Sequence, residues 1–257
     1  MKTLEENKDL KSQIGVLEQQ VNQMRNEQDE FIQIASHDLQ APLRKLSSFT
    51  DLLLSKFPLA ANEEILHYKT KIDSCISQMR ELLDKLTTLS EVTSSRVEFQ
   101  PCDLNLVLKK VLNEMAEGIK INNVAITTSE LPIIEGISNQ FYELFKNLLQ
   151  NAILYRKKDQ SANICIQSRQ IENEEQFLLK YSPNTYYQIE IIDNGIGIDE
   201  ELLEKVFQPF VRLHGKSEYP GHGLGLTICK RIVENHKGIL TVESNNNGSR
   251  FIIFLPK

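Results

Sequence analysis

The stretch FIQIASHDLQAPLR, from Phe31 to Arg44, sets the helical pattern of the N-terminal part of the chain. At about 100° per residue on a helix, its apolar residues and the next leucine gather on one face. They are Ala35, Leu39, Leu43 and Leu46. His37 lies about 160° from the centre of that face, so we expect its imidazole to face solvent. Pro42 lacks an N–H, and it should kink or loosen the helix just beyond the histidine.

The residues before this stretch carry a heptad pattern. Apolar residues step by four and three in turn, which is the seam of a coiled coil. They are Leu10, Ile14, Leu17, Val21, Met24 and Phe31, with the polar Gln28 at the seam position between the last two. A helix this polar gains stability by burying its seam against a partner, so residues 1–30 are expected to form a dimeric coiled coil.

A second helix is expected after a break at Ser55 to Ala61. Asn62 followed by Glu63 is an N-cap with a first-turn carboxylate. The apolar stripe beyond it is Ile65, Tyr68, Ile72, Cys75, Met79, Leu82, Leu86 and Leu89. This pattern predicts an antiparallel helical hairpin over residues 31–92, which two chains could close into a four-helix bundle. We expect residues 93–102 to be a linker.

From residue 103 onward the periodicity alternates between helix and strand. Helical patterns cover Leu104 to Met115, Asn139 to Tyr155 and Leu224 to Asn235. Strand patterns cover Val124 to Thr128, Asn163 to Ser168, Tyr187 to Ile192, Gly238 to Ser244 and Ser249 to Leu255. Residues 103–257 are therefore expected to form an α/β layer structure.

Composition restricts the possible environments and partners. The net charge of -6 argues against nucleic acid as a partner, since phosphate backbones need a basic face. The four cysteines form no C-x-x-C pair, which fits a reducing cytoplasm better than a disulfide framework. No apolar run approaches the roughly 20 residues that span a bilayer, so we expect no membrane span in this chain.

His37 and Asp38 form a pair with nucleophilic chemistry. A carboxylate that holds one ring N–H leaves the other imidazole nitrogen neutral and reactive. The string from Phe31 to Arg44 resembles the phosphoacceptor box of histidine kinases, most closely the H-D-L-Q-x-P-L-R variant of phytochrome-type kinases. By that resemblance, His37 accepts the γ-phosphoryl group of ATP and Asp38 is its acid–base partner. Ala41 departs from the Asn or Thr of many members, and its methyl group cannot orient a water, which argues against their phosphatase activity.

The second half contains motifs that suit a phosphate ligand. Asn147 and Asn151 share one face of the helix expected there. The segment from Asp193 to Ile198, DNGIGI, follows a strand, and its two glycines permit a sharp turn close to a ligand. The segment from Gly221 to Leu226, GHGLGL, opens a helix whose free N–H groups favour phosphate.

In this order, the asparagine helix, D-x-G-x-G, Phe207 to Phe210, G-x-G-L-G-L and Gly248 to Phe251 resemble the N, G1, F, G2 and terminal Gly boxes of the histidine-kinase ATPase domain. The wider family includes gyrase, Hsp90 and MutL. The resemblance implies a Bergerat-type α/β sandwich that binds Mg-ATP. In that frame Asn151 binds Mg²⁺, Asp193 reads adenine, and Arg212 to Gly221 form a lid.

The residues that this resemblance assigns to the nucleotide site are Asn147, Asn151, Tyr155, Arg156, Asp193, Gly195, Gly197, Phe207, Phe210, Arg212, Lys216, Gly221, His222, Gly223, Leu224 and Gly225. One position departs from the pattern. The family commonly has a lysine three residues after the metal asparagine, where this chain has Leu154. Arg156 is the candidate to replace it.

We therefore expect a homodimeric sensor histidine kinase that phosphorylates His37 from Mg-ATP and passes the group to the aspartate of a response-regulator receiver domain. Two alternatives remain. A gyrase- or Hsp90-like ATPase would use a carboxylate base where Asn147 stands. A signalling scaffold would bind nucleotide without phosphotransfer, as the departures at Leu154 and Ala41 allow.

Overall fold

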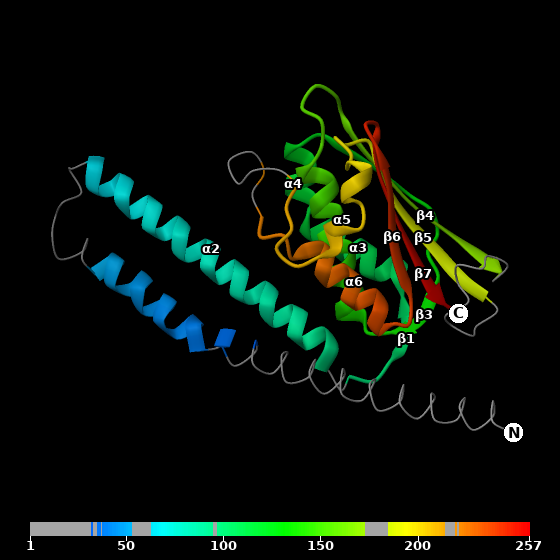
Figure 1. Ribbon diagram of the computed structural model, residues 1–257, viewed down its shortest axis with the longest axis horizontal. Helices are drawn as coiled ribbons and strands as arrows, with labels where there is room; N and C mark the ends of the chain where they lie inside the picture. The colour runs from blue at the N-terminus through cyan, green and yellow to red at the C-terminus, as the bar shows by residue number, and fades with distance from the viewer. Residues whose placement is uncertain are drawn as a thin grey trace, which may run out of the picture. The chain divides into compact units, whose positions relative to one another are not determined.

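The computed structural model describes residues 32, 35, 36, 38–52, 63–94, 97–172, 185–213, 219 and 221–257 (Figure 1). The chain divides into two compact units, Met1–Ser95 and Arg96–Lys257. The coiled coil expected at residues 1–30 and the break expected at Ser55 to Ala61 lie outside the described residues. Within the described part, no helix is both long and apolar enough to cross a membrane.

The first unit contains two helical segments, residues 38–52 and α2, Glu63–Ser94. The described start of α2 agrees with the expected one. The first segment is helical on both sides of Pro42, so the proline does not end it. The two segments pack through a buried cluster of Leu43, Ile76 and Leu83. This cluster joins the two helices of the hairpin.

The apolar stripe predicted for α2 is only partly buried within the chain, with Leu89 in the core. Tyr68, Ile72 and Met79 are 56%, 46% and 43% exposed, while Ile76 and Leu83 are buried. All of these residues lie on one wide apolar face of α2, since Ile72 and Ile76, like Met79 and Leu83, are four residues apart. Within the chain only one edge of that face is buried, and periodicity does not show which edge. On the other segment, Leu39 and Leu46 are also exposed.

The second unit opens with a short strand. Strand β1, Gln100–Asp103, pairs with β3, Ile133–Gly136, in a small antiparallel sheet. Helix α2 continues through Ser94. Part of the linker expected at residues 93–102 is therefore regular structure.

A five-stranded sheet in the order β2-β4-β5-β7-β6 forms the main layer. Its strands are β2 Val124–Thr128, β4 Ala162–Glu172, β5 Thr185–Asp193, β6 Ile239–Asn245 and β7 Gly248–Pro256. Only the β2–β4 pair is parallel. The expected strands are confirmed, and β4 and β5 extend beyond their predicted ends.

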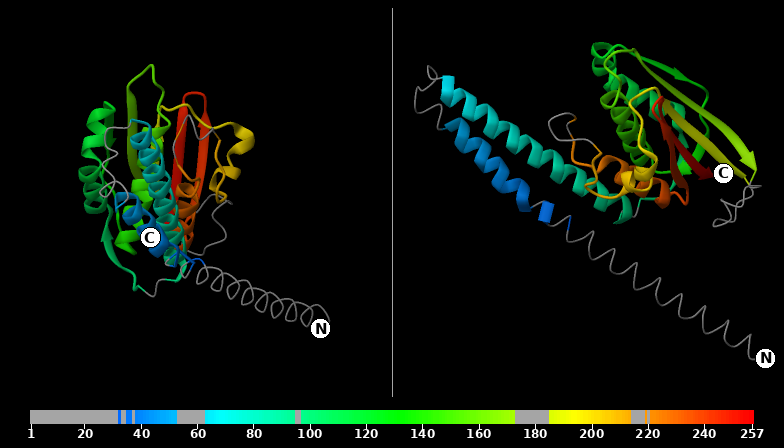
Figure 2. Two further views of the ribbon diagram at one scale, coloured as in Figure 1. Left: turned by 90° about the vertical axis from the view of Figure 1, so that its left-hand side faces the viewer. Right: turned by 45° about the horizontal axis from the view of Figure 1, so that its top comes forward.

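The helices of this unit cover one face of the sheet (Figures 1 and 2). They are α3 Leu104–Glu114, α4 Ala116–Ile121, α5 Ser138–Leu154 and α6 Gly225–Asn235. Two 3-10 turns, Glu200–Leu202 and Lys205–Phe207, precede α6. The core between the layers contains Leu148, Ile191 and Ile232, all fully buried. This confirms the α/β sandwich.

His236, directly after α6, contacts residues in the N-terminal part of the second unit. Its Nδ1 lies 2.8 Å from the carbonyl oxygen of Ile232, and its Nε2 accepts a 3.0 Å hydrogen bond from the N–H of Ile137. The ring lies 4.8 Å from that of Phe99 and 4.2 Å from that of Phe141, between centroids. Because Nε2 is an acceptor, the buried imidazole is neutral. Phe99, expected in the linker, packs on this ring.

We predict that His236 makes the unit sensitive to acid. Burial lowers the pKa of His236, and its contact with Ile232 opposes only part of that shift. A neutral buried histidine contributes stability that is fully present above the ordinary pKa of about 6.5 and is lost as pH falls through the lowered pKa. In His236→Gln, whose amide oxygen can still accept from Ile137, thermal midpoints measured from pH 7.5 to pH 5 should fall less steeply than in the wild type. Parallel slopes would contradict this assignment.

Candidate functional site

Asp193 ends β5 with one carboxylate oxygen held by the backbone. Oδ1 accepts hydrogen bonds from the N–H of Gly195 at 2.8 Å and of Ser249 at 3.3 Å. Within the described residues, Oδ2 makes no hydrogen bond to the protein. Burial raises the pKa of the Asp193 carboxyl, and the two N–H groups oppose part of that shift. The side chain is therefore oriented by one oxygen and offers the other to a ligand.

Glycines allow three segments to meet at Asp193. A Cβ on Gly195 would lie 2.6 Å from the carbonyl oxygen of Tyr155. Gly197, at φ +78°, would place a Cβ 1.9 Å from the carbonyl oxygen of Asn245, and Gly248, at φ +133°, would place one 1.9 Å from that of Asp193. Only glycine fits where backbones approach this closely. The end of β5, the end of α5 and the β6–β7 turn thus form one compact floor.

Hydrogen bonds fix the same three segments. The N–H of Ile196 donates to the carbonyl oxygen of Tyr155 at 3.0 Å. The Ser244 hydroxyl accepts a 2.8 Å bond from the N–H of Ile198. Lys157 donates to the carbonyl oxygen of Asn246 at 2.8 Å. These contacts and the Ser249–Asp193 bond were not predicted, because they depend on strand register, which sequence motifs do not contain.

The two asparagines of α5 have different surroundings. Asn147 is 6% exposed, and its amide donates to the carbonyl oxygen of Glu143 at 2.8 Å. Its Oδ1 lies 3.0 Å from where a Cβ on Gly225 would stand, so it packs against the start of α6. Asn151 is half-buried, and its side chain makes no hydrogen bond in the described part of the chain. The amide oxygen of Asn151 is therefore not used by the described part of the chain.

The segment before α6 is held by backbone contacts. Phe207 is buried, with the Lys230 ammonium 5.7 Å from its ring centroid, whereas Phe210 is 59% exposed at φ +64°. The N–H of Phe210 donates to the carbonyl oxygen of Gly223 at 3.0 Å. Gly223 has φ +71°, and a Cβ there would lie 2.6 Å from a backbone oxygen. The loop thus places Leu224, which is fully buried, at the N-cap of α6.

Aromatic and basic residues border this site. The rings of Tyr155 and Tyr219 lie 5.0 Å apart, and Arg212 donates to the carbonyl oxygen of Tyr219. Arg156 donates to the carbonyl oxygen of Ile153 at 2.9 Å, so one of its nitrogens caps the end of α5. Burial raises the pKa of the Tyr155 phenol.

The remaining predicted site residues lie partly in the described chain and partly outside it. His222 is half-buried, and Gly221, at φ +140°, is exposed. Asp38 is helical and exposed in the first unit. His37 and Lys216 lie outside the described residues.

Comparison with known protein families gives two matches. Residues 136–257 match the family described as "Histidine kinase-, DNA gyrase B-, and HSP90-like ATPase". Residues 27–95 match the "His Kinase A (phospho-acceptor) domain". Together they cover most of the chain.

Among curated proteins, this chain is similar to cyanobacterial phytochrome A of Nostoc sp., with 33% identity over 227 residues. The alignment covers 88% of this chain but 28% of the phytochrome. The chain thus spans less than a third of the length of that relative.

Solved structures share the fold. Full-length ShkA in complex with AMPPNP aligns over 88% of this chain and 45% of ShkA, with a TM-score of 0.67 and 19% identity. Histidine kinase ThkA in complex with response regulator protein TrrA aligns over 91% of this chain and 64% of ThkA, with a TM-score of 0.56 and 23% identity.

We predict that the glycine at residue 248 is required for the fold of the site. Gly248→Ala should lower the thermal midpoint. The left-handed φ alone costs about 1–3 kcal/mol for a residue with a Cβ, and the clash with Asp193 adds to that cost. The matched control is Gly118→Ala in α4, where a Cβ would meet nothing within 4 Å. That change should be neutral or stabilise by about 0.5–1 kcal/mol. Equal midpoints for the two variants would show that the close approach at Gly248 is not constraining.

Proposed function

We propose, on the premise that this chain belongs to the histidine kinases and carries their phospho-acceptor and ATPase domains, that it is an ATP:protein-histidine phosphotransferase. The observation that carries the proposal is the joint presence of the His37 box and of an Asp193 site whose carboxylate has one oxygen open to a ligand. In the proposed division, residues 1–30 form a signalling coiled coil and 31–92 the dimerisation and phosphotransfer hairpin. Residues 93–102 form the linker, which includes the end of α2 and most of β1, and 103–257 form the catalytic domain.

The residues at the Asp193 site fit a magnesium nucleotide. Oδ2 of an ionised Asp193 would accept a hydrogen bond from the adenine amino group. The amide oxygen of Asn151 is a hard ligand that suits Mg²⁺, which also takes phosphate oxygens and waters. When bound, Mg²⁺ neutralises the charge on the phosphates. Gly195 and Gly197 let the backbones of Tyr155 and Asn245 pack against this segment, which fixes the turn that carries Asp193.

The proposed phosphoryl transfer takes place on His37 of the first unit. A neutral ring nitrogen of His37 attacks the γ-phosphorus, an N–P bond forms, and the O–P bond to the leaving ADP breaks. Asp38 holds the proton on the other ring nitrogen and stabilises the cationic ring. A receiver carboxylate then attacks the same phosphorus and returns His37 to its neutral form. Positioning of the reactants supplies most of the rate enhancement.

The geometry of Asn147 disfavours a gyrase-like ATPase. That activity would use a carboxylate base at this position, whereas the Asn147 amide donates to Glu143 and packs on Gly225. An amide cannot accept a proton from water at neutral pH. A scaffold that binds nucleotide without transferring phosphate is tested by the labelling experiment below.

Partner and location are parts of the same proposal. The exposed apolar residues Tyr68, Ile72 and Met79 form an uncovered face on α2, which suits closure into a homodimeric four-helix bundle. The response regulator proposed as the second partner has a parallel in ThkA, which was solved with TrrA. A cytoplasmic site of action fits a substrate such as ATP and the four free cysteines.

Labelling with γ-labelled ATP and Mg²⁺ tests the reaction. The protein should gain an acid-labile, base-stable label that disappears in His37→Gln, because phosphohistidine is hydrolysed by acid. Asn151→Ala should also abolish labelling. The matched control is His67→Gln, which removes an exposed histidine from α2 and should label normally. Label that survives in His37→Gln would refute the assignment.

Asp193→Asn should separate nucleotide binding from stability. A hydrogen bond to a charged group is worth about 1.5–3 kcal/mol, so ATP affinity should fall roughly 10- to 100-fold. The thermal midpoint should stay equal or rise, since an amide oxygen still accepts from Gly195 and Ser249 without the cost of a buried charge. Because the pKa of Asp193 is raised, wild-type affinity should weaken as pH falls toward that pKa, while the variant should show no such loss. Titration calorimetry measures the ATP affinity and its pH dependence, and scanning calorimetry measures the thermal midpoint. If the variant bound ATP as tightly as the wild type, Asp193 would not recognise adenine.

A further inference from the structure

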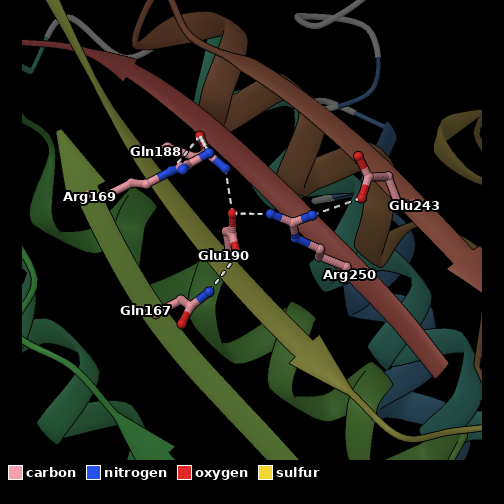
Figure 3. Close-up of polar contacts among 6 residues, drawn as sticks. All are labelled: Gln167, Arg169, Gln188, Glu190, Glu243 and Arg250. Carbon is pink, nitrogen blue, oxygen red and sulfur yellow. Dashed lines mark hydrogen bonds and ion pairs between the residues drawn. The ribbon is translucent and has the colours of Figure 1, made fainter. Parts of the chain in front are cut away.

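A buried carboxylate lies on the face of the sheet that the helices do not cover. Side chains alternate along β5, and Ile189 and Ile191 face the helices, so Gln188 and Glu190 lie on the opposite face. Glu190 is nevertheless only 4% exposed. Figure 3 shows the polar side chains from the neighbouring strands that surround it.

The carboxylate of Glu190 accepts hydrogen bonds from three side chains. Gln167 of β4 donates to Oε2 at 2.7 Å, and Gln188 of β5 and Arg250 of β7 donate to Oε1. Arg250 also pairs with Glu243 of β6 at 2.9 Å. The network therefore connects β4, β5, β7 and β6 side by side, as the dashed lines in Figure 3 show.

The charge of Glu190 is retained in spite of its burial. Burial raises the pKa of Glu190, but the bonds from Arg250, Gln167 and Gln188 outweigh that effect and leave the pKa below its ordinary value. A buried ion pair is weak evidence for stability, since apolar residues of similar size often do as well. Because the pair joins two fixed positions on β5 and β7, it favours one register and one spacing of these strands.

That register determines the geometry of the Asp193 site. Arg250 lies opposite Ile192, and the preceding residue, Ser249, donates its N–H to Oδ1 of Asp193. Gly248 packs its backbone on the carbonyl of Asp193. Arg250 and Glu190 point to the other face of the sheet, so any effect on a nucleotide passes through the strands.

We infer that the Glu190–Arg250 pair positions the adenine-reading carboxylate, by holding β7 against β5 so that Ser249 keeps Asp193 in place. Glu190 and Arg250 are thus positioning residues for base specificity. The inference rests on the proposed function, in which Asp193 reads adenine.

The test compares binding of non-hydrolysable ATP and GTP analogues with Mg²⁺, measured by calorimetry on the full chain. A loosened Asp193 should lose discrimination, because the carboxylate contacts only the adenine amino group. Partial unfolding, in contrast, weakens both nucleotides by the same factor and leaves their ratio unchanged. The ratio of the two dissociation constants therefore separates positioning from a general structural effect.

The variants are Glu190→Gln, Arg250→Gln, their combination, and Glu243→Gln. Glu190→Gln is isosteric, and Arg250 borders an open hollow of about 280 Å³, so neither change leaves a sealed cavity. Each single variant should reduce the preference for adenine about tenfold, which is part of the value of one charged hydrogen bond. The double variant should lose no more than either single one, since the two residues act as a unit. Glu243→Gln, which breaks only the exposed arm of Arg250, should keep the wild-type ratio.

The outcomes separate the two proposals. If the wild type binds neither analogue, or does not prefer adenine, the proposed function fails. If the wild type prefers adenine and both single variants keep that preference, the positioning role is refuted. A loss in Glu243→Gln as large as in Glu190→Gln would also refute it, because the effect would then arise from surface charge and not from the buried pair.

Discussion

Strands β5 and β7 pair so that Arg250 lies opposite Ile192, and this register brings the backbone of Gly248 and Ser249 against Asp193. The two strands are more than fifty residues apart in sequence, so the carboxylate is oriented by a long-range contact. Shifting the register by one residue would turn every side chain of β7 to the other face of the sheet. The inner face of β7, with Ile253 fully buried, would then be lost from the core.

The sharp turns at the glycine motifs could be predicted because they are local. A glycine that must adopt a left-handed φ, or lie against a carbonyl, is visible in the sequence wherever D-x-G-x-G or a terminal glycine occurs. Gly197 and Gly248 have those conformations. Helix α5 and strand β2 were also close to their predicted bounds, since their periodicities are strong. Sharp turns at glycines and strongly periodic helices and strands can therefore be predicted from the sequence alone.

The parts that were missed depend on contacts between distant segments. Strands β1 and β3 have four residues each, too few for a periodic signal, and each exists only because the other pairs with it. Helix α2 has one wide apolar face, so its sequence could not show that Ile76 is buried within the chain while Ile72, four residues earlier on the same face, stays exposed. No sequence motif singles out His236, and only the fold shows that Phe99 lies on its ring.

Two carboxylates on β5, three residues apart, show how the same group is used in opposite ways. Glu190 has its two oxygens saturated by side-chain donors, and its pKa is lowered although it is buried. Asp193 has one oxygen held by backbone N–H groups and one left over, and its pKa is raised. A satisfied charge fixes strands, whereas an unsatisfied one costs stability until a ligand supplies the missing donor. In the inferred arrangement, the saturated pair on one face keeps β5 and β7 in register, and Asp193 on the other face keeps one oxygen for a ligand.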